Sequence, residues 1–470
     1  MKISFILVLS CLLGFAYLQS VPESAKITNL PNLTQDVYQG WILADNLTQT
    51  HLYYQLTSAD GTTLNSSQLN TSIPLLLFLE GGPCDSGTLS LWSDFGPYGV
   101  SSNINITTHN NPSDIKYKVF KRNLTWSGSY HVLAIDSPVF TGYSFSATGF
   151  LGNDTETVTS HLVNFLARFY EVYPSLAASP LHIIGRSYGG HWAPSLGYAL
   201  AKKHNLVLKG NSINLAGVIL HSPLTSQKAQ NGQAAYFLSA GVTDRNKRDF
   251  IASMDQSIKG FLDNNETQKA SIGFTQEQGF IANAVPGYQL TTNITLDNVR
   301  RNRLPFNPNS YEVLANIISP QTFFNLSYPG VSSGRDLFNI PSDVAFLEGY
   351  CTSPYISAGD LAIDYSFALE YLLEQGVQVT ILGGQDDGII LVPGLVQLAN
   401  SLNWSGKINY RLADRKIWRT TGNRVLGNFK KYKNLNLVTL YKSGHLATFD
   451  QPEATLEFMD LTVQNRWPWA

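Results

Sequence analysis

The feature that most constrains the fold is a buried apolar strand that runs into a Gly-x-Ser-x-Gly turn and then into a helix. The segment "LHIIG" at 181–185 predicts the strand, and "APSLGYALAKKH" predicts the helix. Ser187 stands between Gly185 and Gly189. A serine in such a turn needs small neighbours, because its backbone is strained and the strand and helix pass close together. We interpret Ser187 as a nucleophile.

Strands and helices of similar length alternate on both sides of this turn. Apolar β-rich runs end in turn residues, and amphipathic helical stripes separate several of them. The pattern predicts a mostly parallel sheet with helices on both faces, an α/β fold. The predicted strands are "GWILAD", "HLYYQLT", "IPLLLFL", "HVLAIDSP", "LHIIG", "LAGVILHSP", "VQVTILGG" and "NLVTLY", and the clearest helices are 155–173, "YSFALEYLLEQ", "VPGLVQLANSL" and "PEATLEFMDLTV".

Residues 224–340 interrupt this alternation. They are rich in Asn, Gln, Ser and Phe, and they lack clean strand periodicity. We expect them to form an inserted cap of helices and loops on a single domain that spans 21–470.

A serine becomes a nucleophile only when a base removes its proton, and an acid must orient that base. In folds with a strand–serine–helix turn, the acid and then the histidine follow the serine along the chain. Of the histidines after Ser187, only His445 leaves room for an acid at a strand end, whereas His191 is expected to support packing. The segment "VQVTILGGQDDG" offers two acids, Asp386 and Asp387.

The first 20 residues read as a secretory signal peptide, cleaved after Ala16 or Ser20, because one lysine precedes a short apolar run. A net charge of −2 offers no reason to expect nucleic acid or anionic lipid as a partner. Neither a metal-ligand cluster nor a phosphate-binding loop stands out, so no cofactor is expected. Cys84 and Cys351, the two cysteines after the signal, are candidates for one disulfide or for two unpaired buried thiols.

Glycosylation sequons agree with entry into the secretory pathway and with a secreted, lysosomal or vacuolar location. No later apolar run approaches the length of a membrane span. The eleven sequons lie at Asn32, Asn46, Asn65, Asn70, Asn105, Asn123, Asn153, Asn265, Asn293, Asn325 and Asn403.

Five ordered motifs between about Gly40 and Phe458 resemble the serine carboxypeptidases, peptide hydrolases with the α/β-hydrolase fold. "GRSYGGHWAP" resembles the family's nucleophile motif, and "FLEGGPCDSG" resembles its Gly-Gly-Pro turn. "WSGSYHVLAIDSPVFTGYSFS", "GGQDDGIILVPG" with "LNWSG", and "SGHLATFDQPEATLEFM" are similar to the segments that follow. The acid and "LNWSG" segments look closest to the vitellogenic and retinoid-inducible branch.

The resemblance implies roles for individual residues. Ser187 would be the nucleophile, Asp387 the orienting acid as the fourth residue of Gly-x-x-Asp, and His445 the general base. The backbone N–H groups of Gly82 and Tyr188 would form the oxyanion hole. The resemblance also makes a homodimer possible.

Two positions depart from the family pattern. Where the family recognises the C-terminal carboxylate of the substrate with Asn and Glu, this chain has Glu80 and Arg186, and Asp94 matches the backing acid. Arg186 could bind a carboxylate directly, or Glu80 could pair with Arg186 and neutralise it. The alternatives to a carboxypeptidase are an esterase or acyltransferase on the same scaffold and a catalytically silent binding glycoprotein.

Overall fold

The computed structural model describes residues 22–64, 70–102, 117–202, 207–208, 211–241, 243–284, 323–324, 333–420 and 422–467. The predicted signal peptide lies outside the described residues. The same holds for His204 and for four sequon asparagines, Asn65, Asn105, Asn293 and Asn325.

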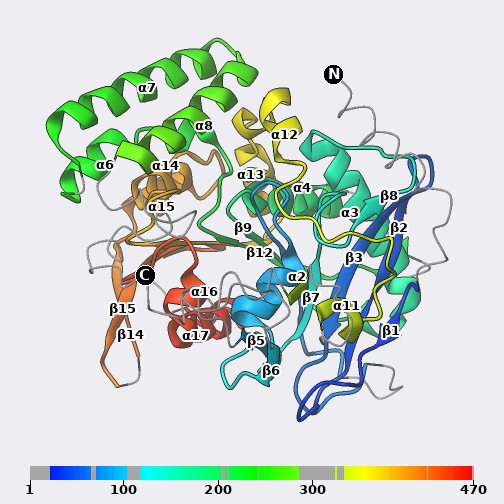
Figure 1. Ribbon diagram of the computed structural model, residues 1–470. Coiled ribbons are helices and arrows are strands. Elements are labelled where there is room, and N and C mark those ends of the chain that lie inside the picture. Colours follow the sequence, from blue (N-terminus) through cyan, green and yellow to red (C-terminus); the bar gives the residue numbers. More distant parts are fainter. Residues whose placement is uncertain are drawn as a thin grey trace, which may run out of the picture.

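A 12-stranded sheet forms the centre of the molecule (Figure 1). Its six inner strands run parallel, which confirms the predicted α/β architecture. In spatial order these strands are β7 (His131–Ile135), β4 (Leu75–Leu79), β9 (Leu181–Arg186), β12 (Leu215–His221), β13 (Gln378–Gly384) and β16 (Leu435–Leu440).

Antiparallel strands extend both edges of the sheet. One edge carries β1 (Ala25–Lys26), β2 (Val37–Asp45), β3 (Thr50–Thr57) and β8 (Phe145–Ser146), and the other carries β15 (Val425–Tyr432) and β14 (Lys416–Arg419). The hairpin of β14 and β15 lies outside the predicted strands. Two small ribbons stand apart from the sheet, β5 (Tyr98–Ser102) with β6 (Tyr117–Lys121) and β10 (Val207–Leu208) with β11 (Asn211–Ser212).

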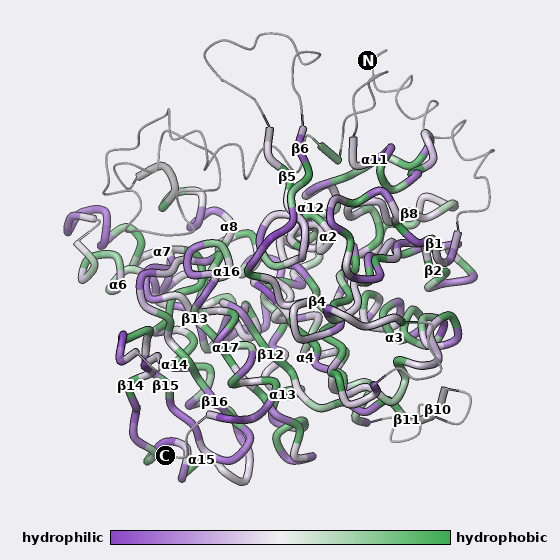
Figure 2. Tube along the Cα trace, turned by 90° about the horizontal axis from the view of Figure 1, so that it is seen from below, coloured by the Kyte–Doolittle hydropathy of each residue, from purple (hydrophilic) through white to green (hydrophobic). Residues whose placement is uncertain are grey.

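Each face of the sheet has its own hydrophobic core, because side chains alternate between the faces along each strand. On β4, Leu75, Leu77 and Leu79 belong to one core, whereas Leu76 and Phe78 belong to the other. Figure 2 shows apolar residues along the inner strands and the helices beside them. The first core includes residues of α3 (Thr155–Val172), α4 (Gly189–Lys202), α13 (Ser366–Glu374) and α14 (Val392–Ser401), and the second includes residues of η2 (Leu91–Phe95) and α17 (Pro452–Val463).

Between β12 and β13 the described residues form helices and loops (Figure 1). The chain leaves the sheet after β12 and returns just before α13, where the Tyr365 N–H donates to the Thr225 carbonyl over 2.9 Å. The helices are α5 (Gln227–Gln230), α6 (Ala234–Ser239), α7 (Arg245–Asp263), α8 (Thr267–Ala284), α11 (Gly334–Leu337), α12 (Thr352–Ala358) and η7 (Asp360–Ala362). Among the described residues, none of the helices is both long and apolar enough to cross a bilayer.

Candidate active site

The turn after β9 holds Ser187 in a left-handed backbone conformation, with a φ of 56°. Its N–H donates to the His221 carbonyl over 3.0 Å, and its carbonyl accepts from Leu224 over 2.8 Å. A side chain at Gly185 would lie 2.1 Å from the Gly189 carbonyl oxygen, so the turn requires a glycine there. These contacts give the sharp strand-to-helix turn that exposes a nucleophilic serine at a sheet edge.

Asp387 and His445 form a buried pair at the end of the sheet where Ser187 lies, beyond the carboxyl ends of β13 and β16. Asp387 Oδ2 lies 2.9 Å from His445 Nδ1, and Asp387 Oδ1 accepts the backbone N–H groups of Ile389 and Ile390 over 2.8 and 2.9 Å. Backbone donors and the imidazole therefore fix both oxygens of this carboxylate. The geometry favours Asp387 over Asp386, whose backbone N–H contacts the histidine loop by donating to the Ser443 carbonyl.

The segment that carries His445 contacts the ends of two sheet strands, β13 and β9. A side chain on Gly384, at the end of β13, would meet the Gly444 carbonyl at 2.1 Å. Thr448 in α16 (Ala447–Asp450) accepts a hydrogen bond from Arg186 Nη1 over 3.1 Å. Because Arg186 precedes Ser187, the segment that carries His445 lies against the serine turn.

His191 and His221 are buried below this edge. His191 Nδ1 donates to the Leu224 carbonyl over 2.7 Å, and its ring stacks on Tyr188. Burial lowers its pKa. Burial and then the charge of Arg186 lower the pKa of His221 to about 3. Both rings pack in the interior, as predicted for His191.

The turn after β4 lies directly against the serine turn. A side chain at Gly81 would come within 2.6 Å of the Tyr188 nitrogen and 2.7 Å of the Ser187 Cβ. Gly82 follows with a φ of 106° and is exposed. The backbone N–H groups of Gly82 and Tyr188, the predicted oxyanion donors, thus belong to two turns in contact.

A disulfide joins Cys84 in this turn to Cys351 at the start of α12, with 5.7 Å between the Cα atoms. The Gly349 N–H also donates to the Cys84 carbonyl over 2.8 Å. The turn after β4 is therefore anchored to the segment around Gly349 and Cys351, which leads into α12.

Arg186 lies in a buried network with two carboxylates (4 % of the residue is exposed). Its Nε lies 3.0 Å from both oxygens of Glu80, and its Nη1 lies 2.5 Å from Asp94 Oδ2. Its Nη2 donates to Glu80 and, over 2.8 Å, to Ser90. Together with the Nη1 bond to Thr448, these contacts engage all three nitrogens of the guanidinium. Of the two predicted roles for Arg186, the geometry favours internal pairing.

Sequence reasoning missed three residues that support the site. Ser90 and Thr448 each link Arg186 to a carboxylate, since their hydroxyls donate to Glu80 and Asp94. Asp360 accepts from the Tyr188 phenol and from the Thr155 N–H over 3.0 Å. Asp360 is 3 % exposed, so an isolated acid in the sequence is a buried anchor for Tyr188, the residue after Ser187. These residues come from distant segments, and no local motif marks them.

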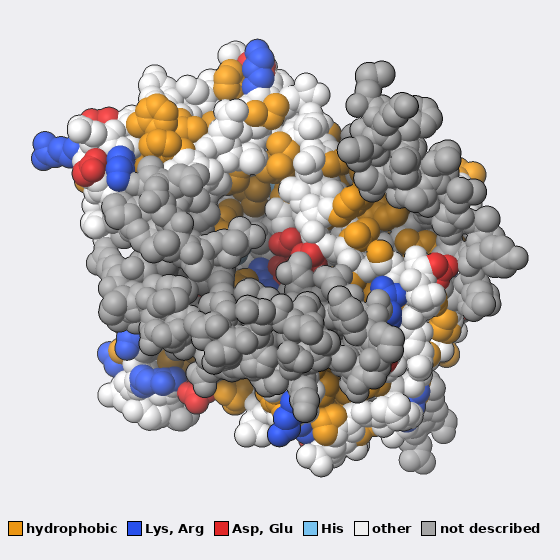
Figure 3. All heavy atoms as spheres, viewed as in Figure 1, with side chains coloured by type: hydrophobic (Ala, Val, Ile, Leu, Met, Phe, Trp, Pro, Cys, Tyr) orange, Lys and Arg blue, Asp and Glu red, His pale blue; other side chains and the backbone are white. Residues whose placement is uncertain are grey.

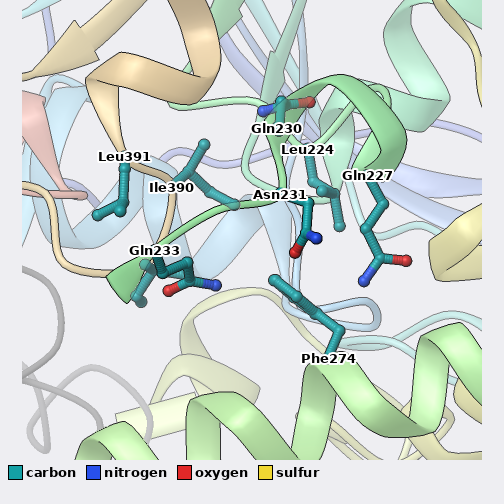
Figure 4. Close-up of a pocket in the computed structure, with 9 residues that line it drawn as sticks. Leu224, Gln227, Gln230, Asn231, Gln233, Phe274, Ile390 and Leu391 are labelled. Atoms are coloured by element: carbon teal, nitrogen blue, oxygen red, sulfur yellow. The ribbon is translucent and has the colours of Figure 1, made fainter. Parts of the chain in front are cut away.

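A small pocket lined by apolar and amide side chains lies between the segment after β12 and the loop that follows Asp387 (Figure 4). Leu224, Gln227 and Asn231 line one side, Phe274 of α8 lies opposite, and Ile390 comes from the loop after Asp387. Gln227 is 1 % exposed, and within the described residues neither atom of its amide has a hydrogen-bond partner. Figure 3 shows acidic side chains, with basic atoms beside them, in a hollow at the centre of the face seen in Figure 1. Within the described part of the chain, no cluster of three or more His, Cys, Asp or Glu could hold a metal ion.

Comparisons with known proteins agree with this geometry. The family model of serine carboxypeptidases matches residues 28–465. Serine carboxypeptidase S10 family member 1 of Dictyostelium discoideum is 26% identical over 446 residues, which cover 93% of this chain and 97% of that protein. Carboxypeptidase Y homolog A of Aspergillus oryzae is 26% identical over 93% of this chain and 75% of its own length.

A solved structure shares the fold. The prohormone-processing carboxypeptidase of Saccharomyces cerevisiae superposes with a TM-score of 0.73 at 18% identity, covering 93% of this chain and 94% of that one. The fold is that of the α/β-hydrolases, as the resemblance implied. From the match over nearly its whole length, this chain belongs to the serine carboxypeptidase family and is a serine-type carboxypeptidase.

Proposed function

We propose that this enzyme cleaves peptides through an acyl-enzyme on Ser187, with His445 as general base and Asp387 as the acid that orients it. Ser187 Oγ attacks the carbonyl carbon of the last peptide bond while His445 takes its proton. The tetrahedral intermediate collapses, the C–N bond breaks, and His445 returns the proton to the leaving amine. Water, activated by His445, then hydrolyses the ester and releases the shortened peptide.

The backbone N–H groups of Gly82 and Tyr188 would stabilise the negative oxygen of each tetrahedral intermediate. The close approach of Gly81 to the Tyr188 nitrogen supports this role, because it brings the two turns together. A donor in such a hole typically contributes about 3 kcal/mol of transition-state stabilisation.

One observation carries the proposal. Asp387, fixed by two backbone N–H groups, meets His445 at the sheet edge where Ser187 adopts its positive φ. A carboxylate held in this way keeps one imidazole nitrogen protonated and leaves the other to act as a base.

A fluorophosphonate probe tests the assignment directly. We expect the wild-type protein to be labelled at Ser187, which peptide mapping would identify, and Ser187→Ala to remain unlabelled. A peptide-library digest at pH 5 and pH 7 would then report whether residues leave from the C-terminus. Absence of labelling in folded protein would support the silent binding glycoprotein instead.

We further propose that the chain is a glycoprotein of the secretory pathway, secreted or held in a lysosomal or vacuolar lumen, and that residues 224–340 form a cap. The disulfide and the sequons at Asn32, Asn46, Asn123 and Asn403 support the location. Glycosidase treatment of protein from a eukaryotic host should lower its mass, and an unchanged mass would contradict the glycosylation.

A further inference from the structure

All the N–H groups of Arg186, the residue before Ser187, donate to groups inside the protein. Arg186 has five N–H groups, and it contacts Glu80, Asp94, Ser90 and Thr448 through all three of its nitrogens. Its side chain is 5 % exposed, and those of Glu80 and Asp94 are 6 % and 3 % exposed. A substrate carboxylate would have to displace one of these partners to reach this guanidinium.

The network also bears a formal negative charge. One guanidinium faces two carboxylates, so the formal charges sum to −1. Glu80 also accepts the Gly81 N–H over 3.0 Å. The backbone donor next to Gly82 therefore already has a partner inside the protein. A third acid, Asp85, packs on the turn itself, since its carboxyl carbon would lie 2.9 Å from a side chain at Gly82.

The same contacts assign Arg186 a positioning role. The side chain of Arg186 links three segments: the turn after β4 through Glu80, η2 through Asp94, and the segment that carries His445 through Thr448. The backbone of Arg186 continues into Ser187. Burial lowers the pKa of the guanidinium, but the charges of Asp94 and Glu80 outweigh burial and raise the pKa above its ordinary value. The guanidinium therefore stays protonated to a higher pH than an ordinary arginine.

We infer that this enzyme does not select substrates by a free C-terminal carboxylate, and that it cleaves the last peptide bond at least as well when the terminal residue is an uncharged amide or ester. A terminal carboxylate would approach a network of like charge without a free N–H on Arg186, which disfavours that substrate. The inference rests on the proposed function and specifies its substrate class. With an amide substrate, His445 protonates the leaving amine and an amino-acid amide is released.

The test compares two N-blocked dipeptides that differ only at the C-terminus, one ending in a carboxylate and one in a carboxamide. Mass spectrometry should detect release of the amino acid and of the amino-acid amide, respectively. We expect kcat/KM for the amide to equal or exceed that for the acid at both pH 5 and pH 7. A preference of tenfold or more for the acid would overturn the inference.

Variants sharpen this comparison. Glu80→Gln removes one negative charge but keeps an acceptor for Arg186, and should raise the acid-to-amide ratio of kcat/KM by about fivefold. Glu171→Gln is the matched control, because Glu171 pairs with Arg168 on the surface of α3, and its ratio should match wild type. If Glu80→Gln does not fold, the wild-type ratio still decides.

Probe labelling separates the two possible failures. An enzyme that is labelled at Ser187 yet prefers the acid overturns the inference and leaves the proposed function standing. A folded protein that is not labelled and cleaves neither dipeptide overturns both.

Discussion

Two buried carboxylate systems flank Ser187, and they are held in different ways. Asp387 receives two backbone N–H groups and one imidazole, whereas Glu80 and Asp94 depend chiefly on the side chains of Arg186, Ser90 and Thr448. Backbone donors remain when side chains change, so the first system needs few particular residues. The second system needs each partner, because a buried charge left alone is costly.

The largest effect should come from Asp387→Asn. An amide in this position donates to His445 Nδ1 and favours the wrong tautomer, so kcat should fall about 10⁴-fold while the fold is kept. Steady-state kinetics on a peptide substrate would measure the loss. Asp386→Asn is the matched control and should cost far less, and a larger loss there would reverse the assignment of the acid.

Arg186→Met should be the most destabilising change in the side-chain network. It leaves Glu80 and Asp94 buried without their cation, so the free energy of unfolding should fall by about 3–5 kcal/mol. Urea denaturation would measure it. Arg168→Met, which removes the exposed ion pairs of Arg168 with Glu23 and Glu171, should cost less than about 1 kcal/mol. Equal losses in the two variants would mean that the network contributes no more than a surface pair.

Another buried carboxyl, Glu277 of α8, extends the comparison to an acid that lacks backbone donors among the described residues. Burial and the nearby charge of Asp255 raise its pKa from 4.5 to about 9. Because the folded state holds this proton more tightly, stability should fall as pH rises from about 4.5 towards 9. Glu277→Gln should remove this contribution to the fall and be more stable than wild type by about 2 kcal/mol at pH 7.

Thermal or urea unfolding across pH checks this expectation. The difference between Glu277→Gln and wild type should vanish below pH 4.5, where the acid is protonated in both states. A variant that is less stable than wild type at pH 7 would show that the ionised form is the stabilised one.

The smallest effect should come from Thr448→Val, which keeps the shape and removes one hydroxyl. Arg186 and Asp94 each lose one hydrogen bond but keep each other, so the expected cost is about 1 kcal/mol in the free energy of unfolding. A large fall in kcat with unchanged stability would indicate that Thr448 also positions the segment of His445.

The sequence predicted the parallel sheet and its strand order along the chain because each inner strand is an unbroken apolar run. Ser187 and His445 could be chosen as candidates because a strand–serine–helix turn is a local signal and the chain order serine, acid, histidine limits the choice of base. The residues alone did not decide whether Asp386 or Asp387 is the acid. Adjacent positions after a strand differ only in which side chain faces the histidine, and the sequence does not show that direction.

Contacts between distant segments escaped prediction. Asp360 reaches Tyr188 across 172 residues, and Thr448 reaches Arg186 across 262, so no spacing rule links them. The hairpin of β14 and β15 escaped for another reason. Its residues, "KIWR" and "VLGNFKKY", mix charged, polar and apolar side chains without the alternation or the unbroken apolar run that predicts a strand.

The hydrogen bond between Tyr365 and Thr225 has a consequence for how the enzyme can vary. The point where the chain leaves the sheet after β12 lies next to the point where it returns before α13. The segment between these two points therefore does not separate the elements on either side of it. Parts of this segment that make no contact with the core or the site can therefore change without shifting the register of β12 against β13, whereas Phe324, Cys351 and Asp360 are held by such contacts. The strand ends that carry Ser187, Asp387 and His445 lie outside the segment.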